Sequence, residues 1–142
     1  MAIRPQQTVT FTTPPAVEIL EKTVQIARTD TTAFDAFVLP KNAVIAGAYV
    51  MGNTASDAGT AATVSVGSNP GTTNECVAAF SVKTNGAGYY AAGAQAGTSM
   101  GSQLTADTLI KAKYVESGTA STAGGPWLVK VEYYIPQQGF SW

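Results

Sequence analysis

FDAFVLPKNAVIAGAYVMG, residues 34–52, is the stretch that decides the fold. It contains two apolar strand patterns separated by the polar corner Leu39–Ala43. Proline fixes φ and removes a backbone donor, so the first strand has to end at Leu39. Asn42 is a residue type that tolerates the left-handed turn conformation. The stretch therefore predicts a strand, a β-turn and a second strand.

The second of these strands, residues 44–51, carries small or apolar residues on both faces. This pattern is typical of a strand that is covered on both sides, away from a sheet edge. A third strand follows a Gly, Ser and Asp-rich break. In residues 62–67, alanine and valine alternate with threonine, serine and glycine, so we expect one face on a core and the other in water.

Period-two patterns extend along most of the chain. Thr8–Thr12 alternates and is stopped by two prolines, which predicts a short strand or an extended arm. Ala16–Arg28 fits a helical stripe or a strand, and we favour a strand for its second half because Thr, Val and Ile prefer pleated surfaces. Further strands are expected over Cys76–Val82, Thr108–Glu116 and Trp127–Ile135, the last with the clearest alternation.

Because the chain shows many strand patterns and no convincing helix, the sequence predicts an all-β fold. About eight strands suit an antiparallel β-sandwich of jelly-roll or related Greek-key type. A chain of 142 residues is long enough for one domain with a proper core. We expect an N-terminal arm or first strand over residues 1–15, the sandwich domain over 16–136 and a C-terminal tail over 137–142.

Composition excludes several kinds of partner. Charged residues make up 12% of the chain, the net charge is -1, and the eight Lys and Arg form no cluster, so nucleic acid is not an expected ligand. Arg4 is followed by polar residues and not by the apolar core of an export signal. No stretch approaches the roughly 20 apolar residues that span a bilayer. Cys76 is the only cysteine, and its apolar neighbours predict a buried, inert thiol.

Catalytic groups are scarce. The chain has no histidine, which removes the commonest general base and metal ligand. A two-carboxylate glycosidase remains formally possible, but the nine Asp and Glu lie mostly beside turn residues and are expected on the surface. No calcium, phosphate-binding or nucleophile-elbow motif occurs. We therefore predict that the protein is not an enzyme and has no catalytic, metal or cofactor site.

Two regions are candidate interfaces. No residue between Thr84 and Ala106 is charged, so this Gly-rich segment contains weak strands, packs against another chain, or is a flexible surface loop. Its large residues belong to types enriched in interfaces. The C-terminal tail also carries aromatics, which either bury themselves against a neighbour or fold back on their own domain. The candidate interface residues are Tyr89, Tyr90, Met100, Phe140 and Trp142.

Five short turn-and-strand phrases recur along the chain between about Thr23 and Ile135. They are Thr29–Thr32, Phe37–Ile45, Thr63–Gly67, Leu104–Ile110 and Thr122–Gly125. These phrases resemble small virion proteins of tailed bacteriophages. The resemblance implies a jelly-roll capsid decoration, or cement, protein that is made in the host cytoplasm. Such a protein binds the outside of the phage head as a dimer or trimer and bridges subunits of the major capsid protein.

An alternative is a glycan-binding or head-fibre-type virion module, because exposed aromatic rings of a sandwich can stack on sugars. Tyr89 and Tyr90 are the residues whose mutation would test it. Trp127 and Tyr133 lie on the stripe expected to be core, where an aromatic ring usually serves packing alone.

Overall fold

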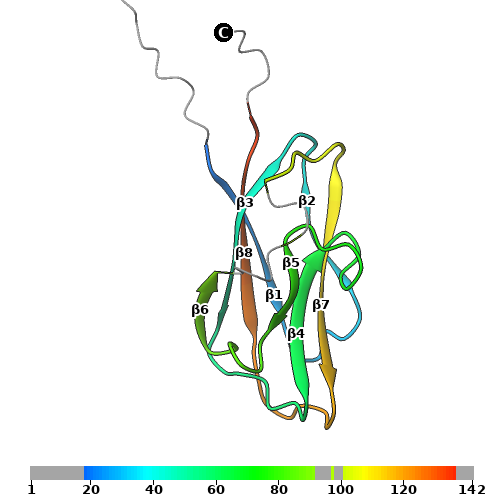
Figure 1. The fold of residues 1–142 in the computed structure, drawn as a ribbon, viewed down its shortest axis with the longest axis vertical. Helices are drawn as coiled ribbons and strands as arrows, with labels where there is room; N and C mark the ends of the chain where they lie inside the picture. Colours follow the sequence, from blue (N-terminus) through cyan, green and yellow to red (C-terminus); the bar gives the residue numbers. More distant parts are fainter. Residues whose placement is uncertain (1–17, 92–96, 98–100, 137–142) are drawn as a thin grey trace, which may run out of the picture.

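The computed structural model describes residues 18–91, 97 and 101–136, which form two four-stranded antiparallel sheets packed face to face (Figure 1). The all-β sandwich predicted from the sequence is confirmed. The strands in this part of the chain are β1 (Leu20–Ile26), β2 (Phe34–Leu39), β3 (Val44–Gly52), β4 (Ala61–Gly67), β5 (Val77–Ser81), β6 (Gly88–Ala91), β7 (Thr108–Ser117) and β8 (Trp127–Tyr134).

The strand order is that of a jelly roll. One sheet runs β1-β8-β3-β6 and the other β2-β7-β4-β5. β1 pairs with β8, β2 with β7, β3 with β6 and β4 with β5. This is the pairing of a long hairpin that is wrapped around a barrel. Of the two topologies that the sequence left open, the structure therefore has the jelly roll.

The corner between β2 and β3 forms as predicted. Asn42 has φ of 70°, in the left-handed region, and the Ala43 N–H donates to the Pro40 carbonyl at 3.1 Å. The backbone N–H of Lys41 donates to Asp107 Oδ1 at 2.8 Å, which ties the corner to the segment before β7. The preference for a strand in the second half of Ala16–Arg28 is also confirmed, by β1.

Two expectations about strand faces are wrong. β3 is an interior strand of its sheet, but it is not covered on both sides, since Ala46 is exposed and Tyr49 only half-buried. A bulge after Ile45 shifts the alternation and turns Ala46 outward, whereas Tyr49 faces outward because it alternates with the buried Ala48 and Val50. In β4, Ser65 and Gly67 are buried and do not face water. The Ser65 hydroxyl accepts the Ala79 N–H at 3.0 Å, where β5 departs from regular pairing.

The core is centred on aromatic residues that lie between the sheets. The Trp127 ring stacks on Tyr114 with 5.4 Å between centroids, and its indole N–H donates to the Gly86 carbonyl at 3.0 Å. Gly86 admits no side chain there, because a Cβ would lie 1.8 Å from the Val82 carbonyl oxygen. Cys76 is buried as predicted, and burial raises the pKa of its thiol to about 12.

The two ends of the sandwich differ in what they carry. We call loop end the one formed by residues 27–33, 53–60, 82–87 and 118–126, which join β1 to β2, β3 to β4, β5 to β6 and β7 to β8. We call terminus end the opposite one, where β1 begins and β8 ends (Figure 1). It also includes residues 40–43, 68–76 and 101–107.

Parts of the charge-free segment belong to the sandwich. β6 lies within it, Gln103 forms a bridge with Val44, and the Gly97 N–H donates to the Cys76 carbonyl at 2.9 Å. Weak strands were one of its expected forms, and the described part has them. No helix in the described ranges is long and apolar enough to cross a membrane. The predicted arm over 1–15 and tail over 137–142 lie outside the described residues.

Candidate interaction surfaces

The carboxylates bind the protein's own loops. Asp57 accepts hydrogen bonds from Thr122 N–H at 2.8 Å, Thr122 Oγ1 at 2.7 Å and Ala123 N–H at 2.9 Å. These bonds favour the ionised carboxylate and lower its pKa to about 2, the Ala123 N–H having the largest effect. The loop between β3 and β4 is thereby fastened to the loop between β7 and β8.

A second polar cluster lies under the same loops. The Tyr114 hydroxyl donates to Glu116 Oε2 at 2.8 Å and lies 2.7 Å from Ser56 Oγ. Burial raises the pKa of Tyr114, whereas hydrogen bonds from Ser121 and Tyr114 lower the pKa of Glu116. Arg28 donates to the Ser121 carbonyl at 2.9 Å and brings the loop between β1 and β2 into the cluster.

Near the terminus end, the buried Glu75 also holds a loop in place by accepting hydrogen bonds. Its Oε2 accepts the Ser68 N–H at 2.5 Å and its Oε1 the Ser68 hydroxyl at 2.6 Å. Among residues 18–91, 97 and 101–136, no three His, Cys, Asp or Glu side chains gather as metal ligands would. The acidic side chains described above serve the fold, so the remaining candidate surfaces are apolar and aromatic.

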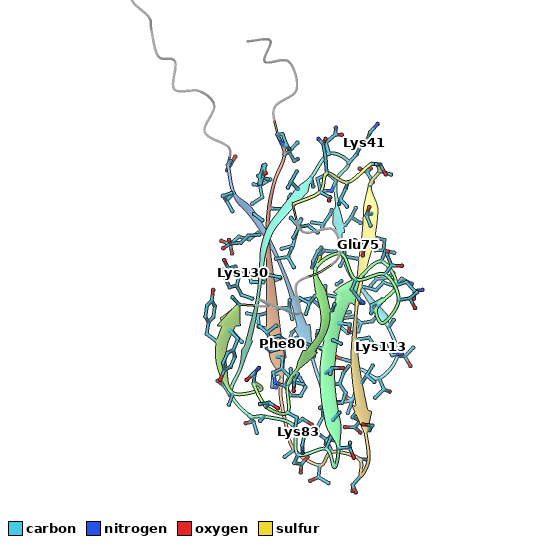
Figure 2. The ribbon with its side chains drawn as sticks, viewed as in Figure 1. Lys41, Glu75, Phe80, Lys83, Lys113 and Lys130 are labelled. Carbon is cyan, nitrogen blue, oxygen red and sulfur yellow. The ribbon has the colours of Figure 1, made fainter. Side chains whose placement is uncertain are left out.

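An aromatic row crosses the outer face of the sheet β1-β8-β3-β6. The Tyr49 ring stacks on Tyr89 with 5.5 Å between centroids and 17° between planes, and Lys130 Nζ lies 5.1 Å from the Tyr49 centroid. Lys130 also pairs with Glu132 at 3.2 Å, and their hydrogen bond raises the pKa of Lys130. In Figure 2, Lys130 lies on the outer side of this sheet, whereas Phe80 lies between the sheets. Tyr89 is thus held in place while 55% of its surface is exposed.

Beside this row lies a shallow hollow of about 230 Å³. Two of the residues that line it carry amide side chains. The lining residues are Gln25, Met51, Gly52, Asn53, Pro126 and Leu128. Leu128 faces outward next to the buried Trp127, so the hollow and the aromatic row form one continuous surface over β8, β3 and β6.

The candidate interface residues have different environments. Tyr89 is exposed, as a docking residue should be, but Tyr90 is half-buried, packs near Phe80 at 6.2 Å and donates its hydroxyl to the Ala87 carbonyl. Met100, Phe140 and Trp142 lie outside the described residues. Whether these five residues form an interface stays a prediction.

Sequence reasoning missed Leu109 as an exposed residue and Tyr49 as a half-buried one. Tyr49 was assigned to a strand buried on both faces, because the apolar residues of β3 do not tell which of its faces lies outside the sandwich. Leu109 could have been found, because it alternates onto the same face as Lys111 and Lys113, whose charges belong in water.

Comparison with solved structures returns the same fold in bacteriophage capsids. A chain of the cyanophage Pam1 capsid asymmetric unit superposes with a TM-score of 0.56 at 19% identity, covering 84% of each chain. A chain of the acid-stable capsid of Helicobacter pylori bacteriophage KHP30 gives 0.55 at 13% identity, covering 84% of this chain and 88% of that one. At these identities the likeness shows a shared fold. No protein-family model and no curated protein matches the sequence.

Proposed function

We propose that the protein is a structural component of a phage virion. Specifically, it is a decoration or cement protein that binds the outer surface of the head and bridges neighbouring major capsid protein subunits. The observation that carries the proposal is the jelly roll shared with chains of two phage capsid structures over 84% of this chain. The proposed protein acts through its shape and contact area. Because many copies bind the same head, avidity multiplies contacts that are individually weak.

The surface composition fits this role. The acidic groups described at the two ends hold loops together, so the rigid body offers its partners aromatic and aliphatic side chains. Rigid loops lower the entropy that binding costs. We further propose that the protein is present in the virion as a dimer or trimer and has no enzymatic activity.

The test uses heads from a phage strain in which the gene for this protein is deleted. Added purified protein should bind these heads with a fixed stoichiometry and raise the temperature at which they release DNA. The control is the same protein denatured by heat before it is added to the heads. Heads that bind no protein, or whose heat resistance is unchanged by bound protein, would contradict the proposal.

A second candidate, glycan binding, is favoured by the aromatic row. The exposed Tyr89 ring stacks on Tyr49, and Gln25 and Asn53 are among the residues that line the adjoining hollow. Together they could offer a stacking surface and hydrogen-bonding groups to a pyranose ring. On a glycan array, Tyr89→Ala should remove any signal and Tyr90→Phe should keep it, because the Tyr90 ring packs inward. Absence of signal for the unmodified protein would reject this candidate.

A further inference from the structure

Four residues form a row across all four strands of the sheet β1-β8-β3-β6, on its outer face. The register pairs Gln25 with Leu128 and Leu128 with Met51. Met51 in turn pairs with Tyr89. Buried residues precede Gln25, Leu128 and Met51 in their strands, so these three side chains face outward. We call the four residues the cross-strand row. Adjacent strands lie about 4.8 Å apart, so the row is ~14 Å long.

The cross-strand row offers an apolar surface with amide groups beside it. At one end, the exposed Tyr89 ring is held by its stacking on Tyr49, with 5.5 Å between centroids. Further along, Leu128 lines the hollow together with Gln25 and Asn53. The side chains of Gln25 and Asn53 form no hydrogen bond with any other residue that the structure describes. Their donors and acceptors are therefore available to a ligand.

The charged residues on this face give the row no surplus of positive charge. Lys130, which lies one row away, pairs with Glu132 at 3.2 Å. Glu21 lies opposite Glu132 in the ladder between β1 and β8. These are the charged residues at the outward-facing strand positions described for this sheet, and two of the three are acidic. The row therefore suits a neutral ligand better than an acidic one.

The size of the row suits a short chain of sugar rings. A stable protein interface buries about 800 Å² on each partner, and a strip ~14 Å long and one residue wide offers only a fraction of that area. A pyranose ring has an apolar face of C–H groups, which can lie on an aromatic or aliphatic side chain, and hydroxyls that can bond to amides. One such ring is about as long as one strand spacing, ~5 Å. The row thus matches about three rings.

We propose that the cross-strand row binds a neutral oligosaccharide of about three hexopyranose rings, which lies across the strands from Tyr89 to Gln25. This inference rests on glycan binding, the second candidate function above, and adds the substrate class, the length and the direction of the bound chain. Tyr89 stacks on the first ring, Met51 and Leu128 contact the second, and the Gln25 amide bonds to hydroxyls of the third.

The dependence of affinity on chain length and charge tests the proposal. The probes are neutral chains of one to five rings of glucose, galactose, mannose or N-acetylglucosamine, first on an array and then in titration calorimetry. For the sugar that binds, affinity should rise at least about tenfold from one ring to three and less than about twofold from three to five. Uronic acid chains of the same length should bind at least about tenfold more weakly.

Matched substitutions test the contacts. Gln25 and Thr23 are both exposed and lie two positions apart on the outward face of β1, but only Gln25 belongs to the row. For the three-ring chain, Gln25→Ala should lower affinity about three- to tenfold and Thr23→Ala by less than about twofold. Tyr89→Ala should lower it at least about tenfold. Circular dichroism checks folding, and Tyr89→Leu, which also removes the ring, replaces Tyr89→Ala if that variant is unfolded.

The outcomes separate the site from the function. If no neutral chain binds, this inference and the glycan candidate both fail, and head binding still decides the decoration role. If chains bind but one ring binds as tightly as three, or Thr23→Ala weakens binding as much as Gln25→Ala, glycan binding stands and the cross-strand row is not its site. Tighter binding of uronic acid chains would overturn the neutral substrate class. If Tyr89→Ala weakens binding to heads and no sugar binds, a protein covers the row and the proposal is wrong.

Discussion

The loop end and the terminus end of this sandwich differ in how many side-chain hydrogen bonds fasten their loops. At the loop end, Asp57, Glu116 and Arg28 all form hydrogen bonds to neighbouring loops. At the terminus end, Glu75 accepts both the N–H and the hydroxyl of Ser68. Each of these bonds satisfies a polar group within the protein itself. The comparison teaches that both ends are fastened from within and that the loop end has the larger network.

The largest effect is expected at the loop end, from Trp127→Ala. This side chain is fully buried, stacks on Tyr114 and bonds to Gly86, so its removal should lower the free energy of unfolding by about 3–5 kcal/mol. Urea denaturation followed by circular dichroism measures the change. Leu128→Ala, one residue along and facing outward, is the control and should cost under about 1 kcal/mol. Equal losses would contradict the placement of Trp127 as the central core residue.

A smaller effect is expected near the terminus end, from Glu75→Ala. The substitution leaves the Ser68 N–H and hydroxyl without their acceptor and should cost about 1–3 kcal/mol by the same measurement. Glu75→Gln, which keeps one carbonyl acceptor, should recover part of the loss. A loss as large as that of Trp127→Ala would mean that the terminus end is fastened as firmly as the loop end, and would weaken the comparison between them.

Acid should loosen the loop end through Asp57. Its pKa falls from 3.8 to about 2 on folding, so the carboxylate stabilises the folded state above about pH 4 and loses that contribution as the pH falls towards 2. The melting temperature of Asp57→Asn should therefore lie below that of the unmodified protein at pH 7, and the difference should shrink between pH 4 and pH 2. A difference that stays constant over this range would argue against the bonds from Thr122 and Ala123.

The smallest effect is expected on an outer sheet face, from Asp35→Ala. Asp35 and Lys111 lie 3.6 Å apart as a cross-strand ion pair, with 39% and 69% of the Lys111 and Asp35 side chains exposed. Solvent and salt screen such a pair, so the loss should be within about 0.5 kcal/mol. A loss of unfolding free energy above about 0.5 kcal/mol that persists at high salt would show that this ion pair, and not only the loop network, stabilises the fold.

Much of the fold could be predicted because its signals are local. The Pro40–Asn42 corner depends on the conformational limits of the two residue types, and the alternation in Trp127–Tyr134 depends on the two-residue period of a strand. The bulges in β2, β3 and β5 were missed, since an extra residue in a strand is decided by its partners. The bulge in β3 explains why Ala46 is exposed although its strand was expected to be buried on both faces.

The sequence by itself determined an all-β chain whose strands alternate, whose corner turns at Asn42 and whose only thiol is buried. These features follow from dihedral limits and from the transfer of apolar side chains out of water, which act over a few residues. Only the tertiary structure decided the jelly-roll order, the Tyr49–Tyr89 row and the bonds from Thr122 and Ala123 to Asp57. Each of these joins residues far apart in the chain, and their proximity depends on which strands pair, which no local preference specifies.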